Sequence, residues 1–143
     1  MSYDKPNRIK YAFHVAALDG DGVQHYPFQG PKGKAGTIWD YGVEGVVTAI
    51  DGTATVGTGP DISIGIAAGN VDAYGEELTM VTAVDTSRSV RNLYDHGTSA
   101  GAASIDALII AAIPADTEAA LVIDEGDAST GEFTAFVIVD WAD

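Results

Sequence analysis

One pentapeptide of this sequence has the spacing of a hydrolase nucleophile. The run GTSAG at Gly97–Gly101 matches G-x-S-x-G, in which the serine needs a histidine as general base. In the hydrolase fold that carries this motif the histidine follows the serine, whereas His14, His25 and His96 all precede Ser99. The alternating strand and helix pattern of that fold is also missing. The sequence therefore predicts a flexible loop at this motif, no catalytic residue, and a protein that is not an enzyme.

Three further patterns resemble ligand-binding motifs, and none of them fits its motif. The run DGDG at Asp19–Gly22 resembles the start of a calcium loop, but the later EF-hand positions hold Val23, Gln24 and Gly30. Gly57–Pro60 lacks the lysine of a phosphate-binding loop, and its proline lacks one N–H donor. The histidines are not spaced to share one helical face. The sequence predicts no cofactor and no metal site, while a loose calcium site among the 21 acidic residues stays open.

Paired carboxylates and aromatic rings are the remaining groups that could take part in catalysis or ligand binding. Glycoside hydrolysis uses two carboxylates whose separation depends on the fold, so Glu76-Glu77 and Asp124-Glu125 do not by themselves indicate a glycosidase. Trp39, Tyr41 and Trp141 lie in expected strands, where packing in a core or between subunits is commoner than sugar stacking. We interpret the carboxylates as solvated groups and the rings as packing residues.

The overall charge excludes several classes of partner. The chain has 143 residues, seven basic against 21 acidic side chains, and a formal net charge of −14. Nucleic acids and anionic membranes both attract clustered Lys and Arg, so neither is expected as a partner. The longest apolar run, Ala107–Pro114, is too short to cross a bilayer, and Met1–Lys10 is too polar for a signal peptide. The absence of cysteine excludes disulfides and thiolate metal sites.

The basic residues are concentrated near the N-terminus. Residues 1–34 carry five basic and three acidic groups, a charge of +2, and residues 35–143 carry two basic and 18 acidic groups, a charge of −16. One explanation is an ordinary acidic protein, and another is a basic arm that lies on an acidic surface of a neighbouring subunit or partner. Cover of the chain's own acidic body would give the same pattern. The five basic residues are Lys5, Arg8, Lys10, Lys32 and Lys34.

Strand and turn signals dominate the chain. Alternating apolar residues are separated by Gly, Asp, Pro and Ser clusters about every 8–12 residues, which is typical of an antiparallel sandwich or barrel. We expect one all-β domain over 1–143, with an N-terminal arm, first strand and long loop in 1–36 and a β-sandwich body in 37–143. The loop is Val23–Gly36, and one short helical turn is expected at Asn70–Leu78. The expected strands are Ile9–Leu18, Thr37–Tyr41, Val43–Ile50, Asp61–Ala67 (with Ile62, Ile64 and Ile66 facing inward), Met80–Val84, Ser89–Tyr94, Ala107–Ile113, Ala119–Ile123 and Glu132–Trp141.

The last of these strands is apolar on both faces. Such a strand lies either at the centre of a sandwich or against another subunit. We expect an oligomer interface here, and its candidate residues are Phe133, Phe136, Ile138 and Trp141.

A family resemblance follows from several short runs. They are GVVTAIDG at Gly45–Gly52, DISIG at Asp61–Gly65, NVDAY at Asn70–Tyr74, IPADTE at Ile113–Glu118, and the final strand within Gly131–Trp141. Over roughly residues 37–142 the chain resembles small virion proteins of tailed bacteriophages, of the capsid decoration or cement type. The resemblance implies a β-sandwich or jelly-roll fold, no catalytic residues, and a trimer bound to the outer surface of the capsid.

The expected partners are therefore the major capsid protein and further copies of this chain. A cement protein cross-links adjacent capsomers, and its N-terminal segment and Gly/Pro-rich loop suit contact with the shell. The candidate contact residues are Lys5, Arg8, Lys10, Tyr26, Phe28, Lys32 and Lys34. The alternatives are another virion component (a head-fibre base, a tail or baseplate module) or a glycan-binding host-attachment domain.

Overall fold

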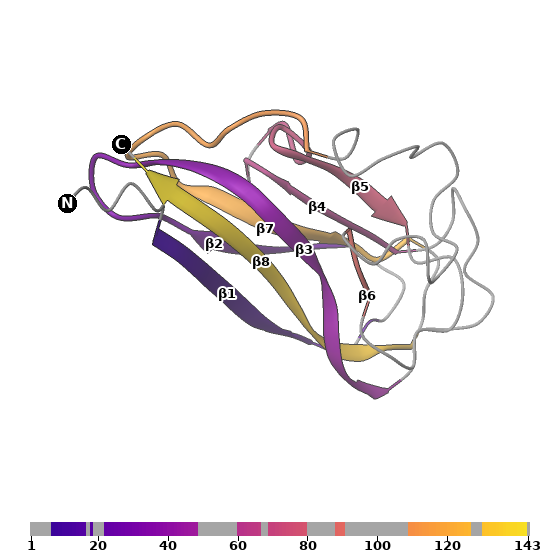
Figure 1. Ribbon diagram of the computed structural model, residues 1–143. Coiled ribbons are helices and arrows are strands. Elements are labelled where there is room, and N and C mark those ends of the chain that lie inside the picture. Colours follow the sequence, from indigo (N-terminus) through magenta and orange to yellow (C-terminus); the bar gives the residue numbers. More distant parts are fainter. Residues whose placement is uncertain are drawn as a thin grey trace.

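The β-strand is the only regular secondary structure in the described residues, and turns and loops connect the strands (Figure 1). The computed structural model describes residues 7–16, 18, 22–48, 60–66, 69–79, 88–90, 109–126 and 130–142. No helix occurs in these residues, which confirms the all-β class. The strands are β1 (Asn7–Val15), β2 (Val23–Phe28), β3 (Ala35–Thr48), β4 (Asp61–Gly65), β5 (Gly75–Thr79), β6 (Arg88–Ser89), β7 (Ala119–Asp124) and β8 (Glu132–Ala142).

The strands form two antiparallel sheets of four strands each. Sheet A has the order β1-β8-β3-β6, and sheet B has the order β2-β7-β4-β5. The pairing is nested, because β1 pairs with β8, β2 with β7, β3 with β6 and β4 with β5. Except for the β4–β5 step, each consecutive pair of strands lies in different sheets. Pairing between the two ends of the chain therefore closes the fold.

Strand β8 is the central element of sheet A. It pairs with β1 over nine consecutive residues, from Asn7↔Trp141 to Val15↔Phe133, and with β3 on its other side. Its odd-numbered side chains point into the core, and they include Phe133 and Trp141, each only 1% exposed. The expected strand and its inward face are both confirmed. On the outward side of β8, Phe136 is only 6% exposed, and the Lys10 side chain of β1 lies over its ring.

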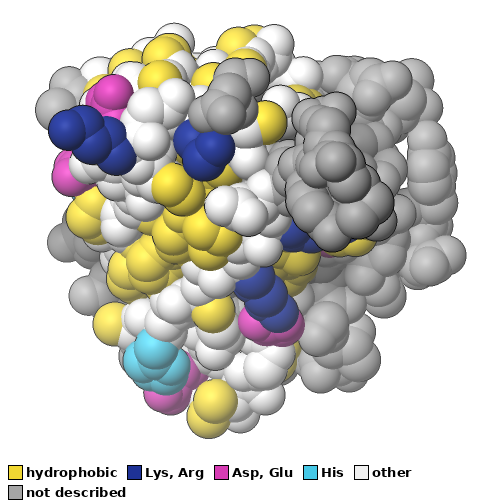
Figure 2. All heavy atoms as spheres, turned by 60° about the vertical axis from the view of Figure 1, so that its left-hand side comes forward, with side chains coloured by type: hydrophobic (Ala, Val, Ile, Leu, Met, Phe, Trp, Pro, Cys, Tyr) yellow, Lys and Arg dark blue, Asp and Glu magenta, His cyan; other side chains and the backbone are white. Residues whose placement is uncertain are grey.

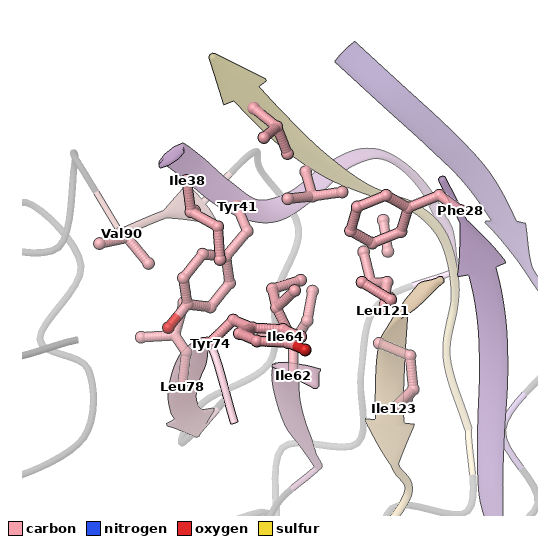
Figure 3. Packing of buried hydrophobic residues seen from close by; sticks show 14 of the residues in the cluster. Phe28, Ile38, Tyr41, Ile62, Ile64, Tyr74, Leu78, Val90, Leu121 and Ile123 are labelled. Atoms are coloured by element: carbon pink, nitrogen blue, oxygen red, sulfur yellow. The ribbon is translucent and has the colours of Figure 1, made fainter. Parts of the chain in front are cut away.

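The core lies between the two sheets (Figure 3). Ile38 and Tyr41 of β3 point toward Ile62 of β4 and Leu78 of β5, and all belong to one buried cluster. The Tyr41 hydroxyl donates a hydrogen bond of 2.5 Å to the carbonyl oxygen of Glu76, and burial raises the pKa of Tyr41. Since both sheets contribute to one cluster, they face each other in a sandwich-like arrangement. The core is therefore a shared product of the two sheets.

The Trp141 indole occupies a slot that only glycine leaves open. A Cβ added to Gly30 would lie 2.5 Å from the ring, and one added to Gly36 would lie 2.6 Å from it. Gly36 is also the register partner of Trp141 between β3 and β8. Trp141 thus packs directly on the backbone at Gly30 and Gly36, which are far from it in the sequence.

We predict that Gly36→Ala lowers the free energy of unfolding by about 1–3 kcal/mol, because the new methyl group overpacks the Trp141 slot. The measurement is urea unfolding followed by tryptophan fluorescence. Gly69→Ala is the matched control, since a Cβ at Gly69 meets no atom within 4 Å. Equal stability of the two variants would contradict the packing role assigned to Gly36.

The helical turn expected at Asn70–Leu78 is wrong. Residues 70–74 form a turn in which Ala73 N–H donates to the Asn70 carbonyl, and Gly75–Thr79 is the strand β5. Tyr74 and Leu78 reach the core from this turn and strand, which imitates the spacing of one helical face. Tyr74 N–H donates 2.9 Å to the Ile64 carbonyl, so the backbone is held by sheet B rather than by a helix.

Other boundaries also differ from expectation. The predicted loop Val23–Gly36 contains β2, and the two strands expected around Gly42 form one strand, β3. Strand β4 confirms the expected strand with Ile62 and Ile64 inward, but Ile66 is 43% exposed. Ala119–Ile123 is confirmed as β7. Instead of a strand, the described part of Ala107–Ile113 forms only the isolated bridges Gly36↔Ile113 and Gly75↔Ile109. The expected strand Met80–Val84 lies outside the described residues, and the expected strand Ser89–Tyr94 is described only at residues 89–90.

Candidate functional site

The outer face of sheet A carries an arginine that two side chains hold, an aspartate and a tryptophan. The register Arg8↔Asp140 places these side chains side by side on β1 and β8. Arg8 Nε lies 2.6 Å from Asp140 Oδ1 and Nη2 lies 3.0 Å from Oδ2, a two-point contact that raises the pKa of Arg8. The guanidinium also lies 4.2 Å from the centre of the Trp39 ring. Trp39 stands beside it because the β3–β8 register shifts between Ile38 and Asp40.

A second cation lies further along the same face. Lys10 Nζ is 2.7 Å from Glu44 Oε2 and 4.9 Å from the centre of the Phe136 ring. Phe136 belongs to the even-numbered, outward side of β8, yet it is only 6% exposed. Lys10 therefore helps to cover this ring while its ammonium group stays beside a carboxylate. At the far end of β1, His14 Nε2 lies 3.1 Å from Glu132 Oε1.

These contacts decide between the explanations for two of the basic residues. Arg8 and Lys10 pair with carboxylates of β8 and β3 in their own chain, so they cover the acidic body from within. Both remain partly accessible, with side-chain exposures of 50% and 46%. Neither lies on a separate arm, because both belong to the nine-residue strand β1. Lys5 lies outside the described residues.

The other candidate contact residues fall into two places. Phe28 is 6% exposed and packs in the core, with its ring centre 4.9 Å from that of Tyr11. It is therefore wrong as a surface anchor, whereas Tyr26 is only half-buried. Lys32 and Lys34 lie in the turn Pro31–Lys34, which Gly33 N–H ties to Asp116 Oδ1 at 2.8 Å. Lys32 is exposed.

The four residues of the expected oligomer interface lie on two different faces of β8. Phe133 and Trp141 are core residues of one chain, so they have no surface to offer a second subunit. Phe136 and Ile138 lie on the outer face of sheet A, where Lys10 covers Phe136. The period-two pattern shows which residues share a face, but not which face meets solvent.

One surface was not expected from the sequence. The side chains Ile9, Tyr11 and Phe13 of β1 and Tyr26 of β2 are only partly buried, and we call these four the edge band. Phe13 and Tyr26 have ring centres 5.4 Å apart, so the band joins the neighbouring edges of both sheets. Figure 2 shows hydrophobic side chains gathered across this side of the molecule, with charged groups beside them. Burial raises the pKa of Tyr11 and of Tyr26.

An acidic group surrounds Glu77 on sheet B. Burial raises the pKa of Glu77, and the nearby carboxylates of Asp61, Asp72, Glu76 and Asp124 raise it further. In the described part of the chain, no cluster of three or more His, Asp or Glu side chains has an arrangement that could hold a metal ion.

We predict that Glu77→Gln increases the free energy of unfolding at pH 7 by about 0.2–0.5 kcal/mol, the scale of an exposed like-charge contact. The raised pKa means that folding favours protonated Glu77, a contribution complete below the ordinary value of 4.5 and lost as pH rises through the raised value. The gain should therefore vanish toward pH 4 in urea unfolding compared with the unchanged chain. Glu118→Gln, at an exposed position outside this group, is the control, and a gain independent of pH would contradict the electrostatic cause.

Comparisons with family models, with curated proteins and with solved structures found no match to this chain. Among the residues that the structure describes, no helix is long and apolar enough to cross a membrane.

Proposed function

We propose that the chain is a non-enzymatic capsid decoration, or cement, protein of a tailed bacteriophage. The observation that carries the proposal is the nested strand order, β1-β8-β3-β6 facing β2-β7-β4-β5. Eight strands in two sheets with this order are consistent with a jelly roll, an architecture that recurs in viral capsid proteins and lectins. The resemblance of residues 37–142 to phage decoration proteins selects the virion role among these. The fold itself does not specify a function.

In this role the protein binds the outer capsid surface and bridges neighbouring capsomers. Burial of apolar area favours association, so a body that contacts two capsomers adds free energy that must be lost before the shell opens. The acidic charge of −14 suits a position outside the shell, away from packaged DNA.

The proposed shell contact is centred on the turn Pro31–Lys34. Arg8 and Lys10 already have carboxylate partners at 2.6 and 2.7 Å, so their charges are largely compensated within the chain. Lys32 is exposed on a turn that Asp116 holds in place, and half-buried Tyr26 lies on β2 just before it. Lys5, which lies outside the described residues, is proposed as a further shell contact on its charge alone.

We predict that capsids lacking the protein open at a lower temperature than capsids to which it has been added back. The physical reason is the loss of the bridging contacts between capsomers. Differential scanning calorimetry of the two capsid preparations measures this directly. An identical melting temperature would contradict the cement role, as would failure of the protein to bind capsids at a fixed ratio to the shell protein.

We predict that Lys32→Glu weakens binding to capsids about tenfold, because it reverses a charge at the proposed contact. Deletion of residues 1–6, which removes Lys5 and leaves β1 whole, should also weaken binding while the unfolding midpoint stays the same. Val47→Glu is the control, since Val47 is 68% exposed near the opposite end of β3. Co-sedimentation with capsids measures all three, and equal loss in Lys32→Glu and Val47→Glu would contradict this contact site.

A further inference from the structure

Strand β1 is the longest open sheet edge in the described part of the chain. It pairs with β8 over nine residues without a register shift and with no other described strand. The other edge strands are less suited to pairing, because β2 contains Pro27, β5 has five residues and a register shift against β4, and β6 has two residues. In an antiparallel edge strand, alternate residues direct their N–H and C=O groups away from the sheet. An added strand can use those groups.

The side chains beside this edge are incompletely buried. Seven hydrophobic residues pack on the core while remaining partly exposed, and four of them form the edge band Ile9, Tyr11, Phe13 and Tyr26. The incomplete part of the core is thus concentrated where the edges of β1 and β2 lie together, as the ring contacts between these two strands show. A strand added to β1 would extend sheet A and cover this band.

We propose that a second copy of this chain pairs through β1, antiparallel, about a twofold axis at Tyr11. This register aligns all nine residues of β1 with their counterparts. It also keeps inward side chains opposite inward side chains, as a shared two-sided sheet requires. The two copies of sheet A would then form one continuous sheet. This pairing is independent of the capsid and differs from the trimer that the family resemblance implies.

The strand is self-complementary in this register. On the inward side, Ile9 lies opposite Phe13 of the second copy and Tyr11 lies opposite Tyr11, and such aromatic and β-branched pairs are favourable across strands. On the outward side, Lys10 lies opposite Ala12, so its stem gains apolar cover. Arg8 lies opposite His14 of the second copy, whose Nε2 is 3.1 Å from Glu132.

Charge also favours a second copy over an unrelated strand. Each Arg8 and Lys10 has a carboxylate of its own chain at 2.6 or 2.7 Å, so two β1 strands approach without opposing uncompensated charges. In addition, the Arg8 of each copy comes close to Glu132 of the other copy, so the twofold axis gives two such contacts. A self-matching strand needs no further assumption about the sequence of a partner.

Sedimentation equilibrium of the full chain tests the proposal, with a concentration-dependent dimer expected. Ala12 is exposed on the outward side of β1, so Ala12→Lys places an ammonium group opposite Lys10 of the second copy at two symmetric positions. It should raise the dissociation constant at least about tenfold, whereas Ala12→Glu should lower it. Val47→Lys, far along β3, is the charge control and should change nothing. A monomer up to about 100 μM, a trimer, or a dimer that Ala12→Lys leaves unchanged would overturn the proposal.

Disulfide cross-linking tests the register of the β1–β1 pairing directly, and it does not depend on the residues of the edge band. The chain has no cysteine, and both Lys10 and Ala12 lie on the exposed side of β1. An oxidised mixture of Lys10→Cys and Ala12→Cys proteins should form a disulfide-linked pair, while neither variant alone should do so, because residue 10 faces residue 12. Cross-linking of either variant alone to the same extent, or none in the mixture, would overturn the register. Circular dichroism of each variant confirms that it is folded before the comparison.

Discussion

The position of β8 between β1 and β3 is the constraint on which the rest of the structure depends. This one strand joins the N-terminal strand to the longest strand, aligns Arg8 with Asp140, and places Trp141 in the slot beside Gly30 and Gly36. Its partners are separated from it by most of the chain, so sheet A closes only after the C-terminal residues are present. Loop closure over such distances is entropically costly, and the burial of the β8 side chains offsets that cost.

Local patterns were sufficient to predict the strands whose side chains alternate between core and surface. Strands β4, β7 and β8 carry consecutive or alternating β-branched and aromatic residues, and each lies inside a sheet. Strand β2 escaped prediction because an edge strand tolerates polar residues and proline, as at Pro27. The supposed helix failed because Tyr74 and Leu78 reach the core through a turn and a strand whose spacing equals that of a helical face.

The candidate site could be predicted only as a set of residue types. The sequence shows basic residues near one end and acidic residues elsewhere, but it does not show which carboxylate each cation meets. Arg8 and Asp140 are 132 positions apart, and only the β1–β8 register brings them together. The same register turns Phe133 and Trp141 inward and Phe136 outward, so half of the expected interface became core. Partner choice is a property of sheet order, which single-sequence patterns do not encode.

The compensation of charge on β1 changes how its edge should be understood. Lysine and arginine on an edge strand ordinarily keep other strands away, because an approaching strand would bury or oppose their charges. Here Arg8 and Lys10 are drawn back over sheet A by Asp140 and Glu44 and lie against the rings of Trp39 and Phe136. Their protective effect is therefore weaker than the composition of the strand suggests. An edge of nine residues whose cations are paired with carboxylates, and beside which the edge band is partly exposed, has the properties of a contact surface.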